Sequence, residues 1–458
     1  MYQNHASRAW IIGLCLAGSL RVAGGDTFYV DAGAADDGGA GTNWDTAKKT
    51  IQAAVDLAGA GDQVLVTNGI YDAGGVVFNP LEGLVTLTNR VAVTNAITLL
   101  AASADPADTL IVGVAHESSN GPAAIRCVYL ADGAVLSGFT LTNGHTTTNG
   151  SITNTYGGGV FCRSTNALIT NCIMADCSAQ AYGGGASRGT LRNCTLLRNQ
   201  AILGGGGGAY GGNVAGCNFI SNTAFTTAAA DANGGGAASA TLTDCLLQYN
   251  RADRFGGAYN CQLRNCVIEF NVGTGRSGGI GGSGGWAESC IIRDNSGQYG
   301  GGAGFTFLTN CLVVNNTGKY AGACDGCTLY QCTIVSNRYA SLLYPAGIRN
   351  SIVVNCIIVS NYTAGVLSNY SASVFTNSCT YPLPEGGAGN ITNEPGFVDY
   401  DARDFHLVKD SPCINAGLDL GFAGVTNDLD GLRRPMYRAY DMGCYENLPP
   451  AIMLMILK

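Results

Sequence analysis

The sequence predicts an all-β protein built as a parallel β-helix, and three repeated positions support this prediction. Cysteines recur at intervals of 21 to 28 residues, an asparagine follows each of them five residues later, and a glycine precedes most of them by nine residues. The cysteines are Cys194, Cys217, Cys245, Cys266, Cys290, Cys311, Cys332 and Cys356. A fixed pattern at this period indicates a repeat architecture.

The apolar positions show how each repeat folds. Ile268 lies two residues after Cys266, and this spacing is typical of a strand with one buried face. Leu263 lies three residues before Cys266, so a corner is needed between them, and Asn265 suits a corner. Such a unit buries its apolar side only by stacking on copies of itself, which makes a solenoid. Helical repeats are excluded by the apolar spacing and by the frequent glycines.

The asparagine and cysteine columns each have a physical explanation. Asparagine tolerates a left-handed turn, and identical amides one rung apart can form a hydrogen-bonded ladder. We expect the cysteines to point inward as small hydrophobic side chains and to remain mostly free thiols. The better disulfide candidates are Cys413 with Cys444, and Cys261 with Cys266. A zinc site at Cys324, Cys327 and Cys332 is disfavoured, because Cys332 belongs to the structural column.

Composition agrees with a solenoid turned by glycines. The chain of 458 residues contains 67 glycines, and charged residues make up only 12%. The formal net charge is −8, so a nucleic-acid partner is not expected.

The first residues read as an export signal. Residues 1–25 contain Arg8, an apolar run over residues 10–20 and small residues before position 26, as a signal peptide does. A buried N-terminal strand is the alternative. We therefore expect a secreted or cell-surface protein.

Residues 26–125 are expected to form an N-terminal cap and the first rungs, and residues 126–380 the β-helix repeats. The segment 44–58 (WDTAKKTIQAAVDLA) has Ile51, Ala54, Val55 and Ala58 on one helical face. A short helix there would cover the open end of the solenoid, where strand edges and apolar core are otherwise exposed.

The segment from 27 to 74, which contains NWDTAKKTIQAAVDLAGAGDQVLVTNGIYDAG, resembles the start of secreted right-handed parallel β-helix proteins of the pectin-lyase-like superfamily. That resemblance implies a right-handed solenoid. The repeats also resemble the passengers of polymorphic outer-membrane proteins, through Gly256-Gly257-Ala258 and Phe219-Ile220-Ser221-Asn222.

Residues 381–446 depart from the repeat. They include EPGFVDYDARDFHLVKDSPCINAG, NDLDGLRRP and DMGCYE, and resemble the C-terminal region of choice-of-anchor Q proteins. The resemblance implies an irregular C-terminal cap that precedes a surface anchor. Asp428, Asp430 and Asp441 are candidate calcium ligands, although turn and cap hydrogen bonds are the favoured interpretation. The apolar tail, residues 447–458, is too short to span a bilayer, so we expect no transmembrane span in the mature chain.

Catalytic candidates are few, because acidic residues do not form a column along the repeats. The best cluster is Glu269 and Asp294 with Arg293 beside them, and a solvated surface is the favoured interpretation. Arg264 and Glu288 are expected to form a surface ion pair between rungs. We therefore assign no catalytic residue.

The binding edge is predicted from loop lengths. Length varies only between each asparagine and the next glycine, and the long loops are residues 223–235, 272–280 and 338–346. Insertions on one edge of a solenoid often form its binding face. The predicted binding residues are Arg276, Arg338, Tyr339 and Tyr344.

Tyr156, Tyr182, Phe255, Tyr299 and Tyr320 precede the glycine runs. They form either an outward ladder able to stack on sugar rings or part of the core, and we expect core or partly covered stacking.

These features favour an exported, monomeric, non-catalytic β-helix protein that binds glycans or extracellular matrix. The alternative is a carbohydrate-active enzyme of the pectin-lyase-like superfamily, either a polysaccharide lyase or a glycoside hydrolase. No cofactor other than calcium is suggested.

Overall fold

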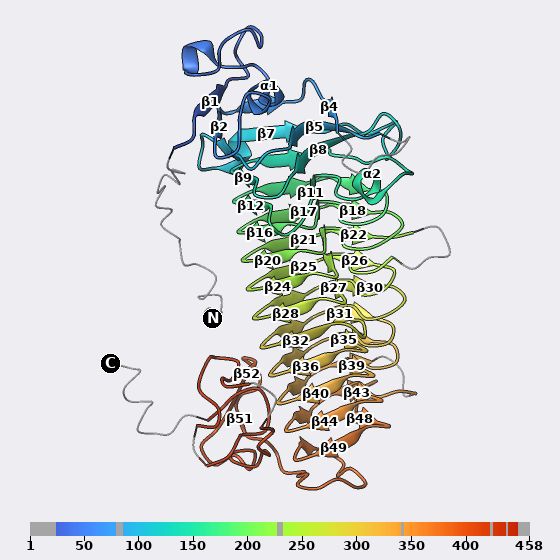
Figure 1. Ribbon diagram of the computed structural model, residues 1–458. Helices are drawn as coiled ribbons and strands as arrows, with labels where there is room; N and C mark the ends of the chain where they lie inside the picture. Colours follow the sequence, from blue (N-terminus) through green and yellow to red (C-terminus); the bar gives the residue numbers. More distant parts are fainter. Residues whose placement is uncertain are drawn as a thin grey trace.

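The computed structural model describes residues 24–78, 86–226, 232–339, 343–421, 425–436 and 438–447. These residues form a long parallel β-helix with a helical cap at its first end and an irregular region beside its last rungs (Figure 1). The predicted fold class is therefore confirmed. Most of the proposed signal peptide and of the apolar tail lies outside the described residues.

Four sheets run along the solenoid, and each middle rung adds one strand to each. Within the described residues, sheet A has 14 strands, from β1 (Thr27–Val30) to β49 (Val374–Thr376). Sheet B has 13, from β3 (Gly69–Tyr71) to β50 (Cys379–Thr380), and sheet C has 13, from β4 (Val76–Val77) to β48 (Tyr370–Ser371). A narrow sheet of 10 strands runs from β14 (Ser178–Ala179) to β47 (Val366–Leu367).

One rung illustrates the repeat. Strand β27 (Ala258–Tyr259) lies in sheet C, β28 (Gln262–Arg264) in sheet A, β29 (Val267–Glu269) in sheet B and β30 (Val272–Gly273) in the narrow sheet. A single left-handed residue stands at each corner between them: Asn260, Asn265 and Phe270, with φ of 49°, 53° and 55°. The prediction of a corner before each cysteine is confirmed.

The left-handed turn expected at the asparagine column is one residue earlier than predicted. Phe270 has the positive φ, and Asn271 that follows it is fully buried. The physical reason is that the asparagine amide must point into the solenoid to reach the neighbouring rungs, so the residue before it makes the corner.

The asparagine ladder itself is continuous. The Oδ1 of Asn295 accepts hydrogen bonds from the backbone N–H and the Nδ2 of Asn271, at 2.9 and 3.0 Å. Its Nδ2 donates to the carbonyl of Ile268 at 2.8 Å and to Oδ1 of Asn316 at 3.0 Å. Each amide in the middle of the ladder is thus satisfied on all four of its hydrogen-bonding sites.

The cysteine column lies in the core. Cys245, Cys266, Cys290 and Cys311 are buried, and each packs among the inward leucine, isoleucine and valine side chains. Every cysteine within the described residues is a free thiol, including the two pairs named above as disulfide candidates. Burial raises the pKa of the Cys290 thiol, which keeps it protonated.

The N-terminal cap is more broken than the predicted helix over residues 44–58. A 3₁₀ turn, η1 (Trp44–Thr46), is followed by a short helix, α1 (Ile51–Val55), whose start is capped by the Thr50 side chain. Ile51, Ala54 and Val55 are buried against the first strands, as the apolar pattern predicts. A second short helix, α2 (Ile152–Thr155), interrupts an early loop.

The C-terminal region has two parts. Residues near Ile391 pair with Cys379 of the last rung and extend the solenoid. The following residues, which contain the antiparallel strands β51 (Phe397–Asp399) and β52 (Asp404–Leu407), pack sideways on the outer face of sheet B (Figure 1). There Phe405, Leu407, Cys413, Met442 and Cys444 cover Leu312, Val314, Val335, Ile357 and Val359.

The described residues contain no helix with the length and apolar character needed to cross a membrane.

Candidate functional site

A row of tyrosines lies along the loop edge beside sheet C, and we call Tyr299, Tyr320 and Tyr344, with Arg276 and Arg349, the tyrosine stripe. The ring centroids of Tyr299 and Tyr320 are 4.8 Å apart with an interplanar angle of 29°, and those of Tyr320 and Tyr344 are 4.9 Å apart. The three tyrosines come from successive rungs and are half-buried. These tyrosines are thus neither core residues nor free side chains. This agrees with the expectation that the aromatic side chains before the glycine runs are partly covered and stacked.

Two arginines lie against these rings. The guanidinium carbon of Arg276 is 4.7 Å from the ring centre of Tyr299 and 5.2 Å from that of Phe305. Arg349 is similarly placed between Tyr320 and Tyr344, at 5.2 and 5.3 Å. Contacts of this kind attract a cation to a ring face and orient both groups.

Arg349 also binds a buried carboxylate on the adjacent strand of sheet C. Its Nε and Nη2 donate to the two oxygens of Asp325, both at 2.9 Å, and the Asp325 side chain is only 2% exposed. This bidentate hydrogen bonding raises the pKa of Arg349. Three N–H groups of the guanidinium are not used by Asp325, and the Arg349 side chain is 17% exposed.

The outer face of sheet C leaves room for this arrangement. Gly281 and Gly304 stand in register between Tyr259 and Asp325. A Cβ at Gly281 would lie 2.2 Å from the Phe255 ring, and one at Gly304 would lie 2.2 Å from Ser277 Oγ. The two glycines therefore allow the loop side chains to lie flat on the sheet.

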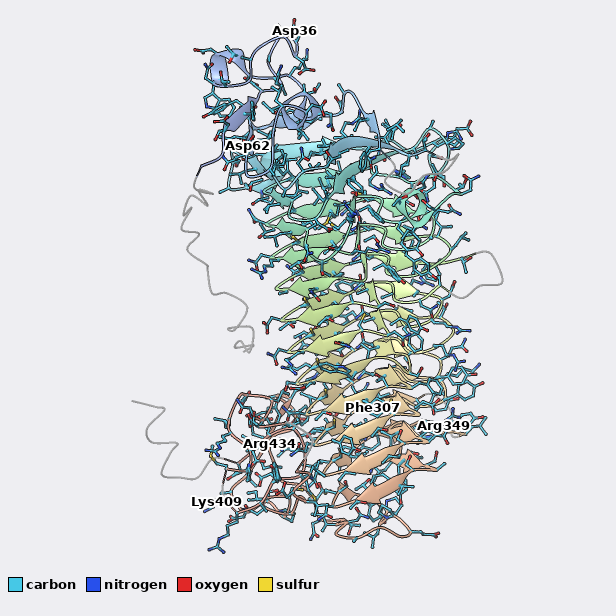
Figure 2. All side chains as sticks on the ribbon, viewed as in Figure 1. Asp36, Asp62, Phe307, Arg349, Lys409 and Arg434 are labelled. Carbon is cyan, nitrogen blue, oxygen red and sulfur yellow. The ribbon has the colours of Figure 1, made fainter. Side chains whose placement is uncertain are left out.

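The structure brings together three of the four predicted binding residues. Arg276 and Tyr344 belong to the tyrosine stripe, and Tyr339 lies with its ring centre 6.4 Å from that of Tyr344. Arg338 is exposed on the neighbouring strand β42 (Arg338–Tyr339). Residues 340–342 of this loop lie outside the described residues. In Figure 2, Arg349 lies on the flank opposite Arg434 of the C-terminal region.

The candidate catalytic cluster is divided between two networks. Glu269 is buried, accepts a 2.6 Å hydrogen bond from Nε of Arg293 and a 2.8 Å bond from Gln248. Asp294 instead binds Asn315 and, at 3.4 Å, Arg403 of the C-terminal region. Both carboxylates are thus engaged with cations or amides. Arg264 and Glu288 form the predicted ion pair at 3.0 Å.

The candidate calcium ligands are placed as turn and cap residues. Asp428 accepts backbone N–H bonds from Asp430, Leu432 and Glu446, and Asp441 accepts them from Asn415 and Asn447. Asp430 binds Nε2 of His406 at 2.7 Å. No group of three histidine, cysteine or acidic side chains is placed to hold a metal ion within the described residues.

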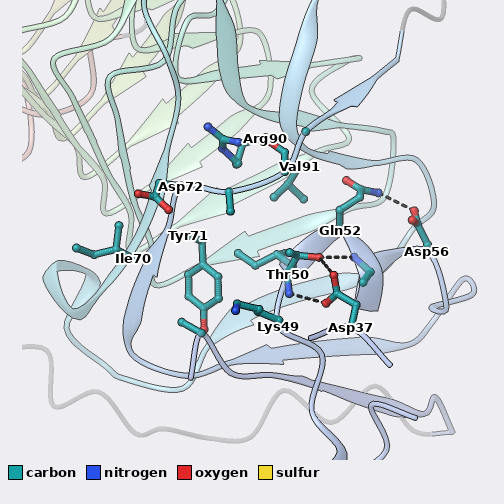
Figure 3. Close-up of a pocket in the computed structure, with 16 residues that line it drawn as sticks. Asp37, Lys49, Thr50, Gln52, Asp56, Ile70, Tyr71, Asp72, Arg90 and Val91 are labelled. Carbon is teal, nitrogen blue, oxygen red and sulfur yellow. Dashed lines mark hydrogen bonds between the residues drawn. The ribbon is translucent and has the colours of Figure 1, made fainter. Parts of the chain in front are cut away.

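A hollow of about 460 Å³ lies at the N-terminal cap, between α1 and β5 (Thr88–Val93) (Figure 3). Most of its polar side chains form hydrogen bonds within the cap. Asp37 accepts hydrogen bonds from the backbone N–H and hydroxyl of Thr50, and Gln52 binds Asp56. The buried Arg90 donates to the Val112 carbonyl at 2.8 Å. These bonds fix the start of the solenoid.

Sequence reasoning missed Asp325 and Arg349 as members of the binding edge. Their signal was available, because the two residues occupy the same offset on consecutive rungs and have opposite charges. Both residues follow the glycine run, whereas loop length points only to residues before it.

No known family profile matches the sequence, and no curated protein matches it. Solved structures with a similar trace include pectate lyase Pel9A, with 14% identity, a TM-score of 0.42, and 92% of this chain and 96% of that chain covered. XylC in complex with xylose has 9% identity, a TM-score of 0.44, and coverages of 92% and 98%. The A-module of Azotobacter vinelandii mannuronan C-5 epimerase AlgE4 has 13% identity, a TM-score of 0.36, and coverages of 75% and 95%.

These are distant likenesses, and they assign no activity to this chain. The parallel β-helix implied by the pectin-lyase-like resemblance is confirmed by the strand pairing of the chain itself. The resemblances to choice-of-anchor Q regions and to polymorphic outer-membrane proteins stay predictions.

Proposed function

We propose that this protein binds an acidic glycan lengthwise along the tyrosine stripe. The observation that supports the proposal is the stacking of tyrosine and arginine side chains on successive rungs of one edge. Tyrosine rings offer flat apolar faces to sugar rings, and guanidinium groups bind carboxylates or sulfates through paired hydrogen bonds. A chain of sugars along the solenoid axis would meet a tyrosine ring on each of three successive rungs, with Arg276 beside Tyr299 and Arg349 beside Tyr320 and Tyr344.

The charge of the edge favours an acidic ligand. Arg276, Lys319, Arg338 and Arg349 lie on or next to the stripe, and of these Arg349 is paired with an acid, Asp325. The chain as a whole has a formal net charge of −8. A local excess of positive charge on an acidic protein attracts anions to that edge and repels them elsewhere.

Affinity electrophoresis in gels containing polygalacturonate tests this proposal, with hydroxyethyl cellulose as the neutral comparison. The substitution Tyr320→Ala removes the central ring and should weaken retardation by roughly ten-fold, equivalent to about 1.4 kcal/mol. Arg349→Lys should weaken it as well, because an ammonium cannot reproduce the bidentate fork. Tyr210→Ala, in a separate tyrosine cluster with Tyr156 and Tyr182, is the matched control. Equal retardation of Tyr320→Ala and the control would refute the proposal.

The same samples test the enzymatic alternative, since a polysaccharide lyase or glycoside hydrolase must also bind a glycan. Release of new chain ends from polygalacturonate would show cleavage. Loss of that release in Glu269→Gln or Asp294→Asn would place the reaction at the cluster with Arg293, whereas its persistence would place it elsewhere. We further propose that the protein is exported, that it is monomeric, and that its partners are glycans or extracellular matrix.

A further inference from the structure

A second surface lies on another part of the solenoid, along the corners between sheet B and the narrow sheet. The residue before each ladder asparagine forms this corner and has a φ between 53° and 58°. In chain order these corner residues are Arg198, Ser221, Tyr249, Phe270, Asp294, Asn315, Ser336 and Ser360. The pairing of Leu197, Ile220, Gln248 and Glu269 places the first four on consecutive rungs.

Tyr249 and Phe270 are unusual members of this column. A bulky side chain in a left-handed backbone conformation is strained, by about 1 kcal/mol or more, whereas small polar residues occupy such corners more easily. The two rings are nevertheless 54% and 39% exposed. They stack on each other with centroids 5.2 Å apart and an interplanar angle of 17°. Strain combined with exposure indicates a role outside folding.

The column is interrupted on the next rung toward the N-terminus. Ser221 occupies the position that would continue the stack, its side chain is short, and Tyr249 on the next rung is 54% exposed. One rung further, Arg198 donates to both oxygens of Asp176, from Nε at 2.7 Å and from Nη2 at 2.6 Å. Rungs repeat about every 4.8 Å, so the space over Ser221 is about one ring thick.

We propose that this space over Ser221 binds one pyranose ring of a neutral saccharide, stacked on Tyr249 and hydrogen-bonded by Arg198 and Ser221. Asp176 neutralises Arg198 while leaving three of its N–H groups for sugar hydroxyls. A neutral sugar is therefore preferred to a uronic acid. This subsite does not depend on the tyrosine stripe, which lies on different strands and has a net positive charge.

The chain itself suggests substitutions that each corner tolerates. Ser221→Tyr copies the residue of the following rung and should fill the space. Tyr249→Ser copies the residue of the preceding rung and should remove the stacking face. Ser360→Tyr makes the same change at the same kind of corner near the far end and is the control.

Saturation-transfer NMR with the methyl glycosides of glucose, galactose and N-acetylglucosamine tests the proposal. The native protein should give a signal with at least one of them, and Ser221→Tyr and Tyr249→Ser should each reduce it at least ten-fold. Ser360→Tyr and Tyr320→Ala should leave it unchanged, which separates this subsite from the stripe. The unfolding midpoint of Tyr249→Ser should be no lower than that of the native protein.

Three results would overturn the proposal. One is the absence of a signal with all three glycosides in the native protein. Another is a normal signal in Ser221→Tyr, since the space would then be filled without consequence. The third is a dimer in sedimentation that Tyr249→Ser abolishes, because the aromatic pair would then serve self-association.

Discussion

The asparagine ladder makes a quantitative prediction about stability at Asn295. Replacing Asn295 by alanine removes the Oδ1 that accepts both the backbone N–H and the Nδ2 of Asn271. It also removes the Nδ2 that donates to the Ile268 carbonyl. The backbone N–H of residue 295 still binds Oδ1 of Asn316, so the loss falls mainly on the preceding rung.

The magnitude follows from the donors left without a partner. Asn271 is fully buried, and each buried donor that loses its acceptor costs about 1–3 kcal/mol. Two such donors give a destabilisation of about 2–6 kcal/mol for Asn295→Ala. At the start of the ladder, Oδ1 of Asn199 accepts one hydrogen bond, from the backbone N–H of Cys177 at 3.1 Å. Asn199→Ala should therefore cost about 1–3 kcal/mol, roughly half as much.

Urea unfolding followed by circular dichroism measures both variants, and hydrogen exchange at the Asn271 amide reports the local effect. Stability in a solenoid is the sum of rung and interface terms, so exchange should increase first at the rungs next to the substitution. If Asn295→Ala costs no more than Asn199→Ala, or if the Asn271 amide stays protected, the reasoning from the ladder is wrong.

Three further predictions concern the column, the loop edge and the C-terminal region. Cys290→Ser should destabilise the protein more than Cys290→Ala in urea unfolding, because it buries a hydroxyl, and native Cys290 should resist thiol reagents. Shortening loop 338–346 to six residues should leave the circular dichroism spectrum unchanged and weaken polygalacturonate binding. His406 should stabilise the C-terminal region at low pH: its hydrogen bond to Asp430 raises its pKa from 6.5 to about 9, so this contribution is complete below 6.5 and is lost as pH rises through about 9. Thermal unfolding should show this loss in the native protein but not in His406→Gln.

The sequence was sufficient to predict the solenoid because the same register recurs on the rungs from Cys194 to Cys356. Cys266, Ile268 and Asn271 each have equivalents on the neighbouring rungs, so an error at one repeat is corrected by the others. The left-handed turn was expected at Asn271, but it lies at Phe270. The preference of asparagine for such turns is a local property, whereas the ladder requires the amide of Asn271 to point inward, and the inter-rung hydrogen bonds decide the outcome.

The side-packed C-terminal region was not predicted, although a signal for it exists. Outward positions of sheet B are polar in the middle rungs, as at Gln248 and Glu269, and become apolar in the late rungs, as at Val314 and Val335. The inward pattern alone explains the repeat, so outward apolar side chains do not by themselves indicate a docking face. The tyrosine stripe was anticipated in part, since loop length indicates an edge, but loop length does not indicate which side chains will meet there.

The C-terminal region packs on sheet B and leaves the two proposed binding surfaces uncovered. The region covers the late rungs of sheet B, and its Arg403 binds Asp294 in the same corner column that contains Tyr249 and Phe270. The aromatic pair lies one rung beyond that contact and stays exposed, while the tyrosine stripe belongs to the loop edge beside sheet C. The C-terminal region buries Leu312, Val314 and Val335 of sheet B, whereas Tyr249 and Phe270 stay 54% and 39% exposed. Their rings are already held by neighbouring rungs, so a sugar that stacks on them would lose little of the binding energy to ordering the site.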